Sequence, residues 1–266
     1  MTFIAAMDNS GGSAGGVLDL YGQEWSEEDK MEKINNFRMR MLSCMNNDTR
    51  QIDTAIMYKD SVQRGMVDEL KARGIEPFLK VDEGCEDNGT LKGFDIHGVC
   101  QWAVEKGCTG TKMRSIVKDE IMVDAVVAQQ IALAEVIRSY NLMPIVEPEV
   151  PIHYPVDYKQ EIEYKLLQSL HRYLDSSHHV VMLKLTIPTV SGLYDTLNNH
   201  RGVERIVALS GGYSTEKACS LLKKNAMSAS FSRGLSEGLK YNMTDEEFNN
   251  KITSNINLIL DACNNA

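Results

Sequence analysis

The sequence predicts an α/β chain folded as one (β/α)8 TIM barrel over residues 1–266. Three observations support this fold class. The length of 266 residues is close to the roughly 250 that this fold uses. Eight short apolar runs recur, and most are continuous rather than alternating, as is typical of strands buried on both faces. Segments with helical spacing separate these runs, and eight strands each followed by a helix is the count that closes a barrel.

The predicted strands and helices alternate along the whole chain. Gly74 and Gly107 stand where a helix stops, and Thr244 with Glu247 begins the last helix as a capping box. We expect strands at residues 3–7, 52–58, 75–81, 108–113, 142–146, 180–186, 206–209 and 227–231. We expect helices at residues 27–45, 61–73, 95–106, 119–140, 158–174, 191–200, 215–224 and 244–263.

An open doubly wound sheet is the alternative fold. A glycine-rich stretch, GGSAGG at residues 11–16, follows the first strand as it does in dinucleotide-binding proteins. Its spacing is not G-x-G-x-x-G, and no acidic residue closes a second strand in the required way. We therefore interpret residues 11–16 as a turn and favour the barrel.

Composition and charge narrow the class of protein. The formal net charge of −9 argues against a general nucleic-acid binder. We also expect no membrane span, because no run of 18 apolar residues occurs. The start of the chain does not resemble a signal peptide, and six cysteines without a CxxC pair suggest reduced thiols. Together these features predict a cytoplasmic protein without a metal site.

A lysine in the predicted sixth strand suggests chemistry. Lys184 lies inside VVMLKLTIP at residues 180–188, where seven of nine residues are apolar or proline. A buried lysine is costly unless its pKa falls or it is paired, and a lysine with a lowered pKa can form a Schiff base with a carbonyl. A strand-end lysine that reaches solvent is the simpler interpretation of this stretch alone.

Charged and small polar residues recur where the other predicted strands end. In a barrel of this type the carboxyl ends of the strands carry the chemistry. We expect Lys112 and Arg114 to lie near Lys184 and to favour its neutral amine, and Glu147 to transfer protons. The sixth predicted strand carries Lys184, and the residues at the ends of the others are Asp8, Lys80, Asp82, Lys112, Arg114, Glu147, Glu149, Ser210, Gly211, Gly212, Ser230, Ser232 and Arg233.

The last two strand ends suggest a phosphate site. Ser210, Gly211 and Gly212 precede a helix that starts near Ser214, so their backbone N–H groups can bind an anion. Arg233 adds a fork-shaped donor, and the loops after strands 7 and 8 are the usual phosphate site of this fold. The cluster therefore suits a phosphorylated keto compound held with its carbonyl at Lys184. It requires no metal, because the iminium serves as the electron sink.

Seven blocks of the sequence, in order, resemble the class I fructose-bisphosphate aldolases, and in particular the shorter bacterial-type branch. The resemblance implies reversible cleavage of fructose 1,6-bisphosphate to dihydroxyacetone phosphate and glyceraldehyde 3-phosphate, without a cofactor. It implies Lys184 as nucleophile, Glu147 as general acid/base, and Asp8 and Lys112 as assisting groups. The blocks are AAMDNSGGS at 5–13, FLKVD at 78–82, TKMRS at 111–115, PIVEPEV at 144–150, MLKLTIP at 182–188, LSGGYS at 209–214 and ASFSR at 229–233.

The same resemblance implies two phosphate-binding groups. Arg114 and Lys80 would lie toward the second phosphate, and Ser210, Gly211, Gly212, Ser232 and Arg233 would hold the phosphate of the ketose half. The chain departs from the family in three places. It begins almost at its first strand, where members usually carry a leading helical segment. It has Glu83 where lysine is common, and its end lacks the tyrosine-ended tail of the animal-type enzymes.

Two rival functions remain at this point. One is another Schiff-base aldolase on the same barrel, with a different sugar phosphate as substrate. The other is a barrel that binds or scaffolds without turnover. The sequence leaves the oligomeric state open, a homo-oligomer included.

Overall fold

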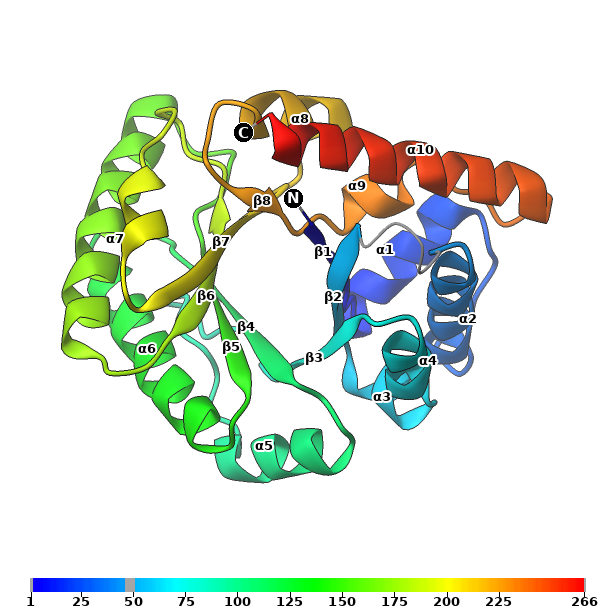
Figure 1. The fold of residues 1–266 in the computed structure, drawn as a ribbon, viewed down its shortest axis with the longest axis horizontal. Coiled ribbons are helices and arrows are strands. Elements are labelled where there is room, and N and C mark those ends of the chain that lie inside the picture. Colours follow the sequence, from blue (N-terminus) through cyan, green and yellow to red (C-terminus); the bar gives the residue numbers. More distant parts are fainter. Residues whose placement is uncertain (1, 46–50, 266) are drawn as a thin grey trace.

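The computed structural model describes residues 2–45 and 51–265. Its eight strands are parallel and follow one another in sequence order around a single sheet, which confirms the predicted barrel and excludes the doubly wound alternative (Figure 1). Each strand lies within three residues of its predicted bounds. The strands are β1 Phe3–Met7, β2 Ile52–Met57, β3 Glu76–Lys80, β4 Gly110–Ile116, β5 Met143–Glu149, β6 Val181–Thr186, β7 Val203–Leu209 and β8 Ser228–Ala229.

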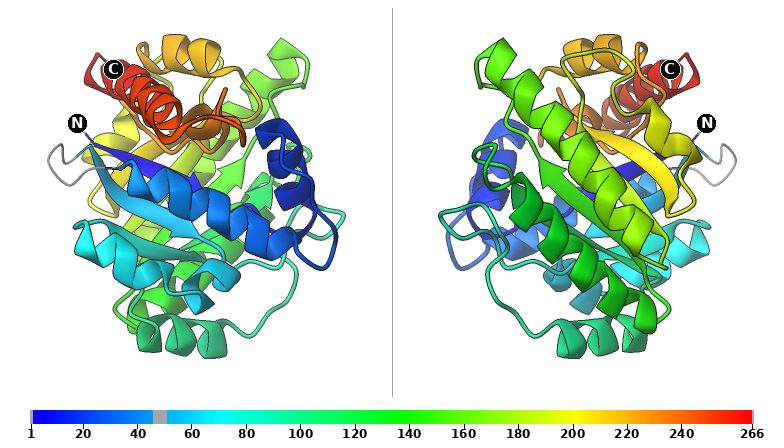
Figure 2. Two further views of the ribbon diagram at one scale, coloured as in Figure 1. Left: turned by 90° about the vertical axis from the view of Figure 1, so that its right-hand side faces the viewer. Right: turned by 90° about the vertical axis from the view of Figure 1, so that its left-hand side faces the viewer.

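Helices cover the outside of the barrel. Figure 2 shows α6 and α7 along one side, and α2 with the short helices α3 and α4 along the other. The predicted helix 61–73 is broken at Gly65, whose φ is +87°, and the predicted helix 191–200 is a short 3-10 turn. The helices are α1 Gly11–Tyr21, α2 Lys30–Ser43, α3 Lys59–Gln63, α4 Met66–Ala72, α5 Ile96–Glu105, α6 Val123–Ser139, α7 Val156–Ser176, η2 Asp195–Asn199, α8 Thr215–Leu222, α9 Arg233–Ser236 and α10 Asp245–Asn264.

The glycine-rich stretch after β1 is helical, so its interpretation as a turn was wrong. Ser10 and Ser13 form a reciprocal capping box at the start of α1, which satisfies two backbone donors. Ala14 and Leu18 are fully buried on its inner face. A Cβ on Gly15 would lie 2.5 Å from the Trp25 ring. Packing against Trp25 therefore requires a small residue at this position, although glycine has a low helix propensity.

A small apolar cluster fills the barrel interior below the carboxyl ends of the strands. It contains Ile4, Ala6, Ile56, Phe78, Ile145 and Val207. Because side chains alternate between the two faces of a strand, the positions two residues further along these strands also face the interior. This alternation directs Asp8, Tyr58, Lys80 and Glu147 into the mouth of the barrel.

The amino-terminal ends of the strands form the opposite end of the molecule. Here Arg205 of β7 reaches Asp53 of β2 at 2.8 Å and the Thr2 hydroxyl at 3.1 Å. The Ser228 hydroxyl of β8 donates to the carbonyl of Thr2, so side chains join the last strands to the first. In the part of the chain that the structure describes, no helix is long and apolar enough to cross a membrane.

Candidate active site

Lys112 lies at the centre of the barrel mouth, on β4. Its Nζ is 2.6 Å from Asp8 Oδ2, 3.3 Å from Glu147 Oε2 and 3.9 Å from Asp82 Oδ2. Only 3% of its side chain is exposed. The ends of β1, β3, β4 and β5 thus place three carboxylates around one buried ammonium.

Lys184 comes from β6, two strands further around the barrel. Its Nζ is 3.1 Å from Glu147 Oε1, and its side chain is 6% exposed. Glu147 therefore lies between the two lysines, with one oxygen toward each. Gln130 of α6 fixes this arrangement from outside the barrel, because its side-chain oxygen accepts the backbone N–H of Glu147 at 2.9 Å.

Burial and charge determine the ionisation of the Asp8–Lys112 pair. Burial alone would raise the pKa of Asp8, but Lys112 and Lys184 outweigh it and lower that pKa well below its usual range. Burial would likewise lower the pKa of Lys112, but Asp8, Glu147 and Asp82 raise it. Both groups are consequently charged at neutral pH. Among the described residues, Glu147 is the carboxylate within ion-pair distance of Lys184.

Arg114 lies on the same face of β4 as Lys112 but further toward solvent. Its Nε is 2.5 Å from Glu149 Oε2, and 43% of its side chain is exposed. This pair raises the pKa of Arg114 despite partial burial. Each of the two cations predicted to lie near Lys184 thus has carboxylate partners of its own, Asp8 and Glu147 for Lys112 and Glu149 for Arg114.

Lys80 of β3 lies beside this cluster. Its Nζ is 3.1 Å from the Ser10 hydroxyl and 3.5 Å from Asp82 Oδ1. Asp82 is nearly buried and also accepts the backbone N–H of Arg114 at 3.2 Å. The structure therefore brings Lys80 and Arg114 to neighbouring strand ends, as predicted.

The predicted phosphate residues meet at the ends of β7 and β8. Gly211 and Gly212 have φ of +58° and +106°, conformations that glycine adopts readily. The Arg233 guanidinium donates to the carbonyl of Gly212 at 3.3 Å. A cavity of about 520 Å³ lies against this turn, and its lining includes Ser210, Gly212, Ser232 and Arg233.

Gln130 escaped the sequence analysis, and so did two residues near Asp8. Asn9, next to Asp8, accepts the Ser232 hydroxyl at 3.1 Å on its side chain. Its carbonyl accepts the guanidinium of Arg38, which is 1% exposed on α2. Burial lowers the pKa of Arg38 to about 10, so it stays charged at neutral pH. The sequence does contain one signal for Arg38, because this arginine interrupts the apolar stripe of α2 between Ile34 and Met41.

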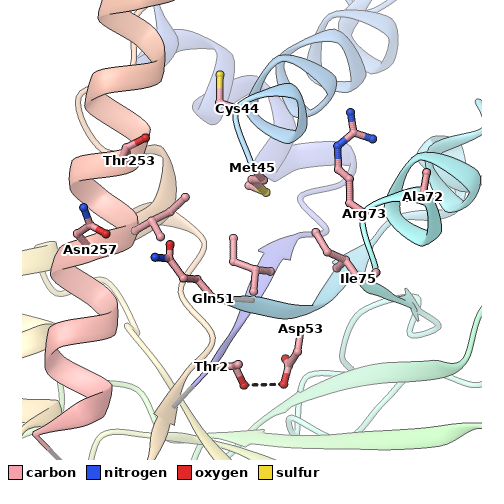
Figure 3. A pocket seen from close by; sticks show the side chains of 13 residues that line it. Thr2, Cys44, Met45, Gln51, Asp53, Ala72, Arg73, Ile75, Thr253 and Asn257 are labelled. Carbon is pink, nitrogen blue, oxygen red and sulfur yellow. Dashed lines mark hydrogen bonds between the residues drawn. The ribbon is translucent and has the colours of Figure 1, made fainter. Parts of the chain in front are cut away.

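A second cavity, of about 770 Å³, lies at the opposite end of the barrel (Figure 3). Thr2, Asp53 and Ile75 line it at the starts of the first three strands, and Thr253 and Asn257 line it from α10. None of the predicted site residues borders it. No group of three His, Cys, Asp or Glu side chains that could hold a metal ion occurs within residues 2–45 and 51–265.

Comparisons with known proteins agree with this geometry. The family model described as glycolytic class I fructose-bisphosphate aldolase matches residues 2–191, which include β1 to β6. A class 1 fructose-bisphosphate aldolase from Porphyromonas gingivalis is 40% identical, over 96% of this chain and 92% of its own length.

Solved structures show the same fold at low sequence identity. The aldolase of Plasmodium falciparum superposes with a TM-score of 0.83 at 18% identity, over 98% of this chain and 90% of that one. An archaeal fructose 1,6-bisphosphate aldolase gives a TM-score of 0.60 at 8% identity, over 98% and 94%. The family match and the 40% identical relative show that this chain belongs to the class I fructose-bisphosphate aldolases, lyases that act through a Schiff base.

Proposed function

We propose that this chain cleaves fructose 1,6-bisphosphate reversibly to dihydroxyacetone phosphate and glyceraldehyde 3-phosphate, with Lys184 as the Schiff-base nucleophile. One observation carries the proposal: a buried lysine and a buried carboxylate lie 3.1 Å apart at the mouth of the barrel. The six free thiols also suit a reducing compartment, and we place the activity in the cytoplasm.

The geometry supports a defined sequence of proton transfers. Glu147 takes a proton from Lys184, and the free amine adds to the ketone carbon to form a carbinolamine. Glu147 returns a proton to the departing hydroxyl, so water leaves and an iminium forms. Glu147, again a carboxylate, takes the proton from the C4 hydroxyl, the C3–C4 bond breaks to release the aldehyde, and the iminium accepts the electron pair to become an enamine. Glu147 returns the proton to C3 of the enamine, and water hydrolyses the resulting iminium to free dihydroxyacetone phosphate and Lys184. Lys112, held by its ion pair with Asp8, keeps an ammonium group 3.3 Å from Glu147 throughout.

Two separate groups of donors support a bisphosphate. We assign the ketose phosphate to Ser210, Gly211, Gly212, Ser232 and Arg233, at the ends of β7 and β8. We assign the second phosphate to Lys80 and Arg114, at the ends of β3 and β4. Lys184 and Glu147 come from the strands between these groups, so a chain of six carbons with a phosphate at each end can place its ketone at Lys184.

The test is borohydride reduction in the presence of dihydroxyacetone phosphate, followed by peptide mass analysis. We expect one adduct, on Lys184, and no adduct in the Lys184→Met variant. Lys165→Met is the matched control, because Lys165 is a partly exposed lysine on α7, and it should be labelled like the wild type. An adduct on Lys112, or none at all, would refute the assignment.

Metal removal tests the same mechanism independently. Since we route every step through Lys184 and Glu147, we expect EDTA to leave the cleavage rate within the error of the assay. A rate that falls with EDTA and returns with added zinc would point to metal-dependent chemistry instead.

A further inference from the structure

Tyr58 occupies the one strand end that the sequence analysis left without a site residue. It follows β2 directly and lies two residues beyond Ile56, which faces the barrel interior. Its neighbour Met57 pairs with Met7 of β1 and with Leu79 of β3. Tyr58 is therefore level with Asp8 on one side and with Lys80 on the other, and it is partly buried.

The ring of Tyr58 lies against the ammonium of Lys80. Lys80 Nζ is 5.6 Å from the ring centroid, within the distance at which the ring quadrupole attracts a cation. Lys59 Nζ is 5.7 Å from the same ring. Lys59 is half-exposed and pairs with Glu83 at 3.6 Å, so its charge is already balanced.

The partners of Lys80 differ in what they do to its charge. The Tyr58 ring and the Ser10 hydroxyl are neutral, so they orient the ammonium without cancelling it. Asp82 Oδ1 forms an ion pair with the ammonium at 3.5 Å, but Asp82 also faces Lys112 Nζ at 3.9 Å, so two cations share this carboxylate. Asp82 also accepts the backbone N–H groups of Gly84 and Arg114. Asp82 therefore balances the charge of Lys80 only in part, and the ammonium is held in place with charge left for an anion.

We propose that the Tyr58 ring positions Lys80 for the second phosphate and so makes this chain prefer a bisphosphate over a monophosphate ketose. The inference rests on the proposed function, and it assigns to Tyr58 a positioning role that acts through Lys80. The aromatic face is the part that matters, because the attraction comes from the ring and not from the hydroxyl.

The test compares kcat/KM for fructose 1,6-bisphosphate with that for fructose 1-phosphate. Loss of a cation–ring contact is worth about a three- to ten-fold effect. We expect Tyr58→Leu to lower the ratio of the two values by that factor, mainly through a higher KM for the bisphosphate. Tyr58→Phe keeps the ring and should hold the ratio within about two-fold of the wild type.

A double-mutant cycle shows whether Tyr58 acts through Lys80. Lys80→Met should lower the ratio more than Tyr58→Leu does, and adding Tyr58→Leu to Lys80→Met should change it no further. Tyr164→Leu, on the outer surface of α7, is the control and should leave the ratio unchanged. If Tyr58→Leu does not fold, Tyr58→Gln takes its place in the same cycle, since a polar side chain suits this partly exposed position.

Three results would overturn the proposal. The ratio could be unchanged in Tyr58→Leu, or it could fall equally in Tyr58→Phe, or Tyr58→Leu could act equally with and without Lys80. Failure of the proposed function looks different: the wild type would then cleave neither ketose, and Lys184 would not be trapped by borohydride.

Discussion

Glu147 is the residue through which the site is organised. One oxygen faces Lys184 at 3.1 Å and the other faces Lys112 at 3.3 Å. Lys112 in turn is held by Asp8, whose side chain is 13% exposed. A buried charge left without its partner is strongly destabilising, so each member of this chain of contacts constrains the next.

The variant Asp8→Asn tests the ion pair between Asp8 and Lys112 through the pH dependence of stability. The pKa of Asp8 is lower in the folded protein than the usual 3.8, so its stabilisation is complete above that value and is lost as pH falls through the lower folded pKa. We expect Asp8→Asn to reduce the free energy of unfolding by about 3 kcal/mol at pH 7 and by less at pH 3. Urea unfolding at both values measures this. An equal difference at the two pH values would contradict it.

At the scale of elements, the loop between β3 and α5 is docked onto the end of β4. The backbone N–H of Ile116 donates to the carbonyl of Gly89 at 3.1 Å, and the Cys85 thiol donates to the carbonyl of Arg114 at 3.3 Å. Gly89 has a φ of +89°. The loop therefore depends on a glycine to reach the strand that carries Lys112 and Arg114.

Gly89→Ala should separate this loop from β4. A Cβ at this position would lie 1.9 Å from the carbonyl oxygen of Ile116, and the backbone conformation is also unfavourable. We expect a loss of about 2 kcal/mol or more in the free energy of unfolding, measured by urea denaturation. Gly93→Ala is the matched control, because nothing lies within 4 Å of its Cβ. A Gly89→Ala protein as stable as this control would show that the loop adjusts freely.

At the scale of the whole molecule, the two ends of the barrel differ in the kind of contacts that they hold. The mouth holds the buried charges described above. The other end is joined by Arg205, which links β7 to Asp53 of β2 and to Thr2 before β1. Because these contacts close the barrel at the end opposite Lys184, they belong to stability rather than to chemistry.

Arg205→Met should therefore lower stability without loss of activity. Asp53 is 40% exposed in this pair, so we expect a cost of only about 1 kcal/mol and a midpoint of thermal unfolding a few degrees lower. We expect kcat/KM to stay within about two-fold of the wild type. The control is Arg201→Met, because Arg201 is an exposed arginine at the same end of the barrel. This variant should change neither the midpoint of thermal unfolding nor kcat/KM. A large loss of activity in Arg205→Met would show that the two ends are coupled.

The sequence by itself determined the barrel and most of the site. Continuous apolar runs mark buried strands because both faces of each strand are covered, and this local signal located all eight strands within three residues. It also indicated Lys184, as a charged residue inside an apolar run, and Asp8, Lys112 and Glu147, because they lie at the ends of other apolar runs. Helix α1 was missed because its glycines have low propensity, and Ala14 and Leu18 gain their stabilisation only by packing.

Only the tertiary structure decided how the charged groups pair. The sequence placed Lys112, Arg114 and Lys184 together as like charges. The folded chain instead inserts Glu147 between the two lysines and directs Arg114 to Glu149. It also decided that Arg38 holds Asn9 and that Tyr58 lies against Lys80. These pairings depend on distances across neighbouring strands and helices, and electrostatic energy varies with distance and burial that no local pattern records.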